Sequence, residues 1–550
     1  MPIKSTQVDA SRATALSQIT PVIAPVVLFG LGFTILFHRW LFSGFDQIIG
    51  DREDGYIALA LIEHWHHVFS GAAHWADPIF FFPQRSVLGY TDAYFLIGLV
   101  HAPLRLAGLD IFTAYMLAIC SLAAIGFFSF RHLAHRHLSI PATYASIGAF
   151  LFAFGNIDAV KLIHVQSYCA MLLPPLCILT LSAFARASIA RAILAGLLYA
   201  ALFMTAFQTA WFFGCYILLL AGLFPLVMGL DQTRDLIGRL VGKQRALVLA
   251  GVAAFAVGMI PFVTLYLPVL AAGHSRDFAE VASNMPIWRD LANVTPENAL
   301  WGQFLKWLEI TGLPNRPVWE AELGFTPAVL TLFVVGKIVW WHSRPAEATN
   351  RLFILLGAAV IGMWLLQLEY GGFRPWRLVW AIMPGGGAIR YPFRSQLVAN
   401  LLVCLVVARA FSSTVKWLSF APLISLVLIA EQINRTWPPT FSRTSALAFI
   451  GTAQPPADCR AFYIAPRTPE RGPDSPEHQT AAMLLAEIRN IPTVNGDSSW
   501  TPEGWALDRP SVEDYPAKLR DWVLAHGVEQ GICGFDLDSG RWTIGLPYVK

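Results

Sequence analysis

Apolar residues fall into long runs along this chain, and short polar loops separate the runs. A membrane-spanning helix needs about 20 consecutive, mostly apolar residues. Eleven segments reach or approach this length: 21–42, 109–130, 141–156, 165–185, 190–208, 209–229, 246–270, 323–341, 351–369, 395–411 and 417–431. The pattern therefore predicts an all-α polytopic membrane protein with about eleven transmembrane helices.

The segment Tyr94–Leu106 is also apolar, but His101, Pro103 and Arg105 interrupt it. An additional crossing here would invert every later helix and move the basic loops to the other side of the membrane. We therefore expect a juxtamembrane or half-inserted helix, which is tolerated where it lies against protein or a cavity.

Basic residues gather in every second loop, for example at Arg131–Arg136 and in the stretch 234–245. Cytoplasmic loops of membrane proteins carry an excess of Lys and Arg. We therefore place the N-terminus in the cytoplasm. The loops 43–108 and 271–322, and the tail after residue 433, then lie on the opposite, outer face.

The tail differs in character, because Pro, Arg, Asp and Ser become more frequent after residue 433. Its periodicity predicts short strands and two helices, with a hairpin turn around Asp538. The helices are expected at 477–489 and 515–526, the strands at 460–465, 530–535 and 541–546, and a linker at 438–456. The chain thus divides into a membrane domain, 1–433, and a small extracytoplasmic α/β domain, 434–550.

Two of the seven cysteines, Cys459 and Cys533, lie in this tail, and the other five lie in apolar spans. A pair of cysteines in an extracytoplasmic domain can form a disulfide. Two buried thiols are the alternative, and both interpretations stay open at this point.

Composition narrows the class of protein further. Hydrophobic residues make up 55% of the 550 residues and charged residues only 14%, whereas soluble proteins carry about 25% charged residues. This excludes a single soluble domain, a disordered chain and a coiled coil. A net charge of +3 is too small for a basic nucleic-acid binder, so the partner that composition implies is the lipid bilayer.

The richest polar motif follows the first span, where Asp51, Glu53 and Asp54 fall within four positions. Carboxylates at a membrane surface can accept a proton from a hydroxyl group or hold a divalent cation such as Mg²⁺ or Mn²⁺. The alternative is a hydrated helix start, because Asp is common at an N-cap and in a first turn.

Other polar residues in the outer loops are candidates for lining a substrate pocket. They are Glu53, His64, Asp92, His164, Gln166 and Tyr370. A zinc site at the histidines is not supported, because no second His pair or Cys pair occurs at ligand spacing. Lys161, which precedes His164, is interpreted as a side chain that reaches lipid headgroups.

Arg390 and Arg394 follow the run Gly385–Gly387 and lead directly into a predicted span. Two guanidinium groups four positions apart can hold a phosphate through their planar forks. Contact with ordinary lipid phosphate is the simpler alternative. The segment is not a P-loop, because the terminal Lys-Ser/Thr is absent.

Together these motifs resemble the layout of the GT-C superfamily of polytopic membrane glycosyltransferases, in particular its bacterial branch. The resemblance covers the membrane domain and is carried by five short segments. They are Gly50–Asp54, Phe80–Pro83, Tyr90–Asp92, His164–Gln166 and Arg390–Arg394.

The resemblance implies transfer of a sugar from a polyprenyl-phosphate carrier to a glycan, lipid or protein acceptor, with inversion, at the outer face of the inner membrane. Asp51 or Asp54 would be the base or the ligand of a divalent cation, and Arg390 and Arg394 would hold the lipid phosphate. Many members have a tight acidic pair in this loop, whereas Arg52 and Glu53 separate the two aspartates here. The periplasmic tail would help to bind the acceptor.

Three other functions remain as alternatives. A transporter or flippase of a lipid-linked substrate would show repeats and charges near the middle of spans, but here the charges gather at span ends. A glycan ligase or polymerase shares the predicted topology. A scaffolding protein would need its tail and not its acidic loop.

Overall fold

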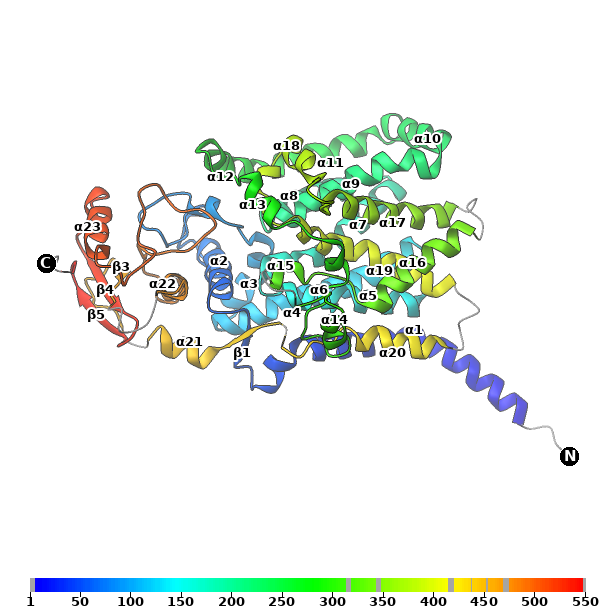
Figure 1. Cartoon of the computed structure of the whole chain (residues 1–550), viewed down its shortest axis with the longest axis horizontal. Helices are drawn as coiled ribbons and strands as arrows, with labels where there is room; N and C mark the ends of the chain where they lie inside the picture. Colours follow the sequence, from blue (N-terminus) through cyan, green and yellow to red (C-terminus); the bar gives the residue numbers. More distant parts are fainter. Residues whose placement is uncertain are drawn as a thin grey trace.

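The computed structural model describes residues 5–312, 318–342, 348–413, 420–436, 438–451, 454–467 and 474–547. A bundle of helices forms most of the molecule, and the C-terminal tail lies at one end of this bundle (Figure 1). We call this end the tail end. Residues 313–317 of the predicted loop 271–322 lie outside the described residues.

Long apolar helices build the bundle because they are hydrophobic on all sides and pack against one another or face lipid. Their order along the chain is α1 (Ser5–Phe42), α4 (Ile111–His132), α5 (Ala142–Ala153), α7 (Leu173–Ala185), α8 (Ile189–Phe203), α9 (Phe207–Met228), α11 (Arg245–Gly258), α12 (Ile260–Ala271), α16 (Pro327–His342), α17 (Ala348–Gln367), α19 (Gln396–Ser413) and α20 (Ala421–Ala430).

Within the described residues, seven helices are long and apolar enough to cross a membrane. An eighth is added if α10 (Leu230–Val241) and α11, which meet at an angle of 72°, count as one broken span. The multi-helix architecture of membrane type thus agrees with the sequence, but the predicted count of eleven spans is not confirmed. One predicted span, 246–270, divides into α11 and α12, because Pro261 starts a new helix and cannot continue the old one.

The ambiguous segment forms α3 (Phe95–Leu106), a helix of 12 residues. At 1.5 Å per residue it is roughly 18 Å long, against the ~30 Å hydrocarbon core of a bilayer. It packs against α2 (Asp54–Phe69) and α4. This length agrees with a half-inserted helix and is too short for a crossing.

Short elements at the tail end of the bundle connect the long helices. They are η1 (Val87–Tyr90), α6 (Asn156–Lys161), η3 (Val165–Leu172), α13 (Phe278–Ser283), η4 (Trp288–Ala292), α14 (Gly302–Trp307), α15 (Val318–Ala321), α18 (Trp376–Ile382), η5 (Gly386–Ala388) and η6 (Pro392–Ser395). At the opposite end, η2 (Leu133–His137) extends α4.

The tail is a small α/β unit, as predicted. Its sheet has the order β3 (Ala461–Ile464), β4 (Ile532–Asp536) and β5 (Arg541–Ile544), with β3 and β4 parallel and β4 and β5 antiparallel. Helix α22 occupies the predicted residues Glu477–Arg489, and α23 spans Tyr515–Ala525. The turn between β4 and β5 is held by Asp536, whose carboxylate accepts the N–H groups of Asp538 and Ser539.

The predicted linker 438–456 is wrong in its first half, where the chain forms β2 (Thr440–Ser442) and α21 (Arg443–Phe449). Strand β2 pairs antiparallel with β1 (Gln47–Ile49), which directly precedes the acidic loop. Residues 437 and 452–453 lie outside the described residues. The first part of the tail is therefore fixed to the first loop before the chain enters the sheet of β3, β4 and β5.

The tail is docked on the loop 43–108 through backbone hydrogen bonds. The N–H of Phe81 donates to Asn495 O (3.0 Å), and the N–H of Thr493 donates to Ile79 O (2.8 Å). The ring of Phe81 is fully buried against Trp505, at 4.9 Å between centroids. Helix α22 also packs on α2, so one hydrophobic core continues from the bundle into the tail.

The structure joins Cys459 and Cys533 in a disulfide, with 5.8 Å between the Cα atoms. Cys459 lies two positions before β3, and Cys533 lies within β4, where its register partner is Phe462. The other five cysteines are free thiols of the bundle.

Candidate functional site

Ionisable side chains from four elements and one connecting position meet at the tail end of the bundle, beside the start of α2. They are Asp54 (α2), Lys161 (α6), His164, which precedes η3, Glu320 (α15) and Arg394 (η6). We call these five residues the charged cluster. Except for Lys161 and His164, its members are far apart in the sequence, so the packing of the helices brings them together.

Glu320 lies at the centre of the charged cluster, between two cations. Its Oε1 accepts from Lys161 Nζ at 2.8 Å, and its Oε2 accepts from Arg394 Nε at 2.9 Å. Arg394 Nη2 also donates to Oε1, so the contact between the guanidinium and the carboxylate is bidentate. The side chains of Lys161, Glu320 and Arg394 are 1%, 3% and 11% exposed. Lys161 is thus a buried ion-pair partner, and its interpretation as a headgroup contact is wrong.

His164 connects this ion pair to Asp54. Its Nε2 lies 3.3 Å from Arg394 Nη2, 3.5 Å from Asp54 Oδ2 and 3.9 Å from Glu320 Oε1. Burial, with the charges of Lys161 and Arg394, holds the pKa of His164 well below its usual value, so the imidazole is neutral at pH 7. Among the described residues its Nδ1 has no hydrogen-bond partner.

Asp54 is the accessible carboxylate of the charged cluster, with 45% of its side chain exposed. Burial of its surroundings, together with the charge of Asp51, raises its pKa to about 6. A carboxylate with this pKa is ionised at pH 7 and is a stronger base than an ordinary Asp. Asp54 is therefore both accessible from outside the charged cluster and more basic than an ordinary Asp.

Asp51 has a different role in the structure. Its Oδ1 accepts the backbone N–H groups of Glu53 (3.0 Å) and Gly55 (3.1 Å), at the start of α2. This arrangement is the helix start that the sequence allowed as an alternative for the acidic loop. Glu53 is exposed at the surface of this loop.

Asp92 and Gln166 lie next to the charged cluster and form hydrogen bonds with the segments around it. Asp92 Oδ1 accepts the N–H of Phe207, the first residue of α9, at 2.9 Å, so it caps this helix. Gln166 Oε1 accepts from the hydroxyl of Tyr94 at 2.8 Å. Burial raises the pKa of Asp92, and Arg394 acts on it in the opposite direction. Helix α9 also supplies Gln208, whose Oε1 accepts from Arg394 Nη1 at 3.3 Å.

Three predicted residues lie away from the charged cluster. His64 is buried within α2 and contacts Trp75 O at 3.0 Å, and burial lowers its pKa to about 4. Tyr370 is exposed and its hydroxyl donates to Leu365 O. Arg390 binds Glu280, at 2.7 Å between Nε and Oε1, rather than Glu320, and its side chain is 44% exposed.

Arg390 and Arg394 therefore do not form one fork around a shared group. Both guanidinium carbons lie close to the ring of Tyr391, at 5.0 and 4.9 Å from its centroid. Tyr391 thus separates a shallow arginine from a deep one. The sequence indicated both residues but not that they have different depths and partners.

A metal ion was predicted at Asp51 and Asp54. In the described part of the chain, no three His, Cys, Asp or Glu side chains form a group that could hold a metal ion. Asp51 is occupied by backbone N–H groups, and Glu320 is neutralised by two cations. The cation at Asp51 and Asp54 stays a prediction, and no step below uses one.

Sequence reasoning missed Glu320 and Gln208 as members of the site. Glu320 is one of several acidic residues in the loop 271–322, and nothing local distinguishes it from Glu280 or Glu309. A buried cation needs a counter-charge, so a buried interpretation of Lys161 was the one signal that could have led to Glu320.

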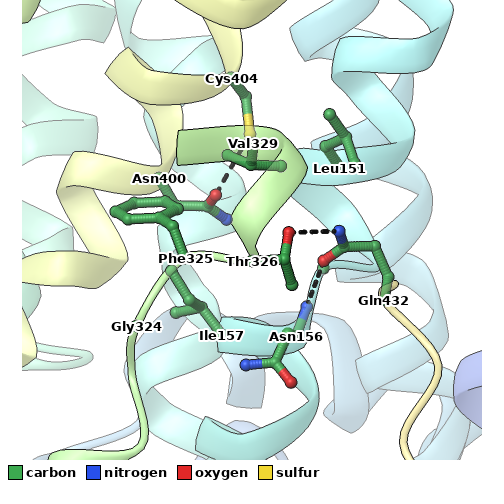
Figure 2. Close-up of a pocket in the computed structure, with 11 residues that line it drawn as sticks. Leu151, Asn156, Ile157, Gly324, Phe325, Thr326, Val329, Asn400, Cys404 and Gln432 are labelled. Atoms are coloured by element: carbon green, nitrogen blue, oxygen red, sulfur yellow. Dashed lines mark hydrogen bonds between the residues drawn. The ribbon is translucent and has the colours of Figure 1, made fainter. Parts of the chain in front are cut away.

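A small interior pocket is lined in part by residues of α6 (Figure 2). Hydrogen bonds around this pocket hold α6 in place. The N–H of Asn156 donates to Gln432 Oε1 (2.9 Å), and Gln432 Nε2 donates to Thr326 Oγ1 (3.1 Å). On the other wall, Asn400 Nδ2 binds the carboxylate of Asp158 at 3.1 Å. Residues of α6, α16, α19 and the end of α20 are thereby held together, which fixes the position of Lys161 at the end of α6.

No protein-family model matches this chain, and no curated protein matches it. Among solved structures, the chain is similar to the oligosaccharyltransferase of Archaeoglobus fulgidus. The apo form is 10% identical with a TM-score of 0.48, over 94% of this chain and 69% of that one. The complex with Zn and sulfate is 11% identical with a TM-score of 0.49, over 93% and 68%.

A third structure of the same enzyme, tethered to an acceptor peptide with the NVT sequon through a disulfide bond, is 11% identical. Its TM-score is 0.49, over 88% of this chain and 64% of that one. At this identity and TM-score the similarity does not indicate which reaction this chain catalyses. The function proposed below therefore rests on the residues of the site.

Proposed function

We propose that this chain is a membrane glycosyltransferase of the GT-C type. It transfers a sugar from a polyprenyl-phosphate-linked donor to a hydroxyl or amide group of a glycan, lipid or protein acceptor. The reaction takes place at the tail end of the bundle, which we assign to the outer face of the cytoplasmic membrane. Asp54 is the catalytic base, and Arg394 stabilises the leaving phosphate.

The observation that carries this proposal is the contact of an accessible base with a buried cation through one neutral imidazole. Asp54 lies 3.5 Å from His164, and His164 lies 3.3 Å from Arg394. A group that accepts a proton and a group that stabilises a departing anion thus both lie beside the imidazole of His164. Displacement at an anomeric carbon needs these two functions.

The transfer takes place as a single displacement at the anomeric carbon. The acceptor oxygen or nitrogen forms a bond to the anomeric carbon while its proton passes to the Asp54 carboxylate. The bond from the anomeric carbon to the phosphate oxygen breaks, and the electron pair leaves with the phosphate. Arg394 interacts most strongly with the charge that develops on this oxygen, so it lowers the barrier. Attack from the side opposite the phosphate inverts the anomeric centre.

The lipid part of the donor explains why such a site lies at a helix-bundle end. The polyprenyl chain stays among the apolar helices, and the sugar phosphate reaches the polar end. A transporter instead places its charged residues near the middle of spans, whereas four of the five cluster residues here lie in short end elements or at a helix start. A ligase or polymerase that moves whole glycans would use the same chemistry.

The test is donor turnover by detergent-purified Asp54→Asn protein, measured as sugar release from a panel of polyprenyl-phosphate sugars. We expect a loss of at least about 100-fold, because the amide cannot accept the proton. Asp51→Asn is the matched control. The amide oxygen of Asn can accept the same two backbone N–H groups as Asp51 Oδ1, so this variant should retain turnover within a few-fold.

Wild-type turnover with an equal rate in both variants would contradict the assignment of Asp54. Loss of turnover in Asp51→Asn alone, with normal folding, would make Asp51 the base. Absence of turnover with every donor of the panel, together with accelerated movement of a lipid-linked probe across vesicles, would favour the flippase alternative.

A further inference from the structure

Glu320 occupies the position between Lys161 and Arg394 that an anionic ligand would need. Its two oxygens accept from both cations, and Arg394 offers the planar fork with which guanidinium binds carboxylate and phosphate alike. Lys161 adds a point charge on the same oxygen. A phosphoryl group offers the same kind of oxygens to these donors.

The charges of the site show why Glu320 and a phosphate exclude each other. Burial alone would raise the pKa of Glu320. The charges of Arg394 and Lys161 outweigh burial and hold this pKa below its usual value, so the carboxylate is charged. Two cations, Lys161 and Arg394, then balance two anions, Glu320 and Asp54. A phosphate added to this neutral group, in which Lys161, Glu320 and Arg394 are buried, would be an uncompensated charge, which is strongly unfavourable.

The element that carries Glu320 differs from the elements that carry the two cations. Glu320 also lines a small pocket together with Ser283, Asn284, Asp290 and Phe393. Glu320 lies on α15, an element of only four residues in the long excursion between α12 and α16. Lys161 and Arg394 lie on α6 and η6, which adjoin α5 and α19 of the bundle. Movement of the carboxylate is therefore easier than movement of the cations.

We propose that Lys161 and Arg394 form one oxyanion site for a phosphoryl group, and that Glu320 is a displaceable anion that fills this site until the phosphoryl group enters. Lys161 is thereby a further binding residue for the donor phosphate. The identity of the anion as donor phosphate rests on the proposed function. The existence of the oxyanion site does not, because it can be tested without turnover.

The experiment measures thermal unfolding of the full-length protein in an uncharged detergent, with sodium phosphate or sodium chloride at equal ionic strength. In chloride, Glu320→Gln should unfold at a lower temperature than wild type, because two buried cations lose their counter-charge. Phosphate should restore this stability. We expect the phosphate concentration at half effect to be at least about tenfold lower in Glu320→Gln than in wild type.

Two further variants define the site. Lys161→Met combined with Glu320→Gln should lose the phosphate effect, since one of the two cations is gone. Glu280→Gln is the matched control, because Glu280 also binds two arginines, Arg276 (3.3 Å) and Arg390 (2.7 Å), but at the surface. Phosphate should not stabilise this control more than it stabilises wild type.

The source of the phosphoryl group is distinguished in nanodiscs of phosphatidylcholine with and without phosphatidylglycerol. Stabilisation of Glu320→Gln by phosphatidylglycerol but not by inorganic phosphate would assign the site to a lipid headgroup, and the reverse to a soluble or donor phosphate. Both outcomes support the oxyanion site.

Equal phosphate effects in wild type, Glu320→Gln and Glu280→Gln would overturn the proposal. If Glu320→Gln does not fold, Glu320→Asp replaces it. Its shorter side chain keeps the charge but weakens the clamp, and phosphate must then stabilise it more than wild type. Phosphate binding without turnover of any donor would leave the oxyanion site standing and would count only against glycosyl transfer.

Discussion

Asp51 and Asp54 are three positions apart, yet the structure gives them different environments. Asp51 holds the backbone of the helix start, whereas Asp54 is accessible and contacts His164. The charge of Asp51 still acts on Asp54 and contributes to its raised pKa. At the residue scale, one carboxylate therefore shapes the basicity of the other.

This coupling predicts the pH dependence of turnover. Because only ionised Asp54 accepts a proton, the rate should rise with pH through the pKa of about 6 and level off above it. Asp51→Asn removes a like charge that raises this pKa, so the midpoint should move to lower pH. The measurement is the pH profile of donor turnover in both proteins, at saturating donor.

Asp508→Asn changes an exposed carboxylate of the tail and serves as the control, with an unchanged midpoint. A profile that is flat between pH 5 and pH 7 in the wild type, or a midpoint that moves upward in Asp51→Asn, would contradict the assignment of the base.

At the scale of elements, the entry into α2 depends on two glycines that touch. Gly50 adopts a φ of +119°, and a Cβ at this position would meet the Cα of Gly55 at 2.8 Å. Its N–H donates to Pro439 O at 2.9 Å, next to strand β2. The close approach of the two backbones sets the direction of the chain from β1 to Asp54, the first residue of α2.

Gly50→Ala should therefore damage both stability and activity. We expect a loss of about 1–3 kcal/mol from the free energy of unfolding, because the new Cβ is both strained and crowded. A displacement of Asp54 by about 1 Å should also lower turnover by up to about 100-fold. Thermal unfolding and donor turnover measure the two effects.

Gly71→Ala separates strain from crowding. Gly71 follows the other end of α2, has a φ of +78° and has no atom within 4 Å of an added Cβ. This variant should lose about 1–2 kcal/mol of stability and keep its turnover. If both variants lose turnover equally, the contact of Gly50 with Gly55 does not position the site.

At the scale of the whole molecule, the tail contacts the bundle directly as well as through the chain that joins them. Strand β2 pairs with β1, the segment 493–495 bonds to residues 79–82, and Trp522 Nε1 donates to Phe82 O at 3.0 Å. These contacts lie on the same loop that leads from Asp54. The stability of the tail should therefore influence the site.

Replacement of both Cys459 and Cys533 by Ser tests this link. The disulfide closes 74 positions of sequence, and its loss should lower the stability of the tail by about 2–4 kcal/mol. Hydrogen exchange should increase in β3, β4 and α22, and protection of residues 79–82 should fall with them. Hydrogen exchange read by mass spectrometry measures both regions in the full-length protein.

Cys177→Ser is the control, because Cys177 is a free, half-buried thiol of the bundle. It should leave exchange in the tail unchanged. Faster exchange in the tail with unchanged protection at 79–82 would show that the two parts are not coupled.

The sequence by itself determined those features that depend on local pattern. Apolar runs predicted helices of membrane type, and the periodicity of the tail located α22 at its observed bounds, 477–489. The polar loops indicated Asp54, His164 and Arg394, which the structure brings into contact. The prediction of the helices succeeds because hydrophobic periodicity is a property of neighbouring residues, whereas the roles of the three polar residues stay predictions.

Only the tertiary structure decided which charges meet. Lys161 and Glu320 are 159 positions apart, and Glu320 and Arg394 are 74 apart. The burial of Lys161 follows from the packing of α6 against its neighbours, and the outward position of Arg390 follows from its contact with Glu280. The burial and pairing of a charge depend on its neighbours in space, and the order of residues along a chain does not contain this information for side chains on separate elements.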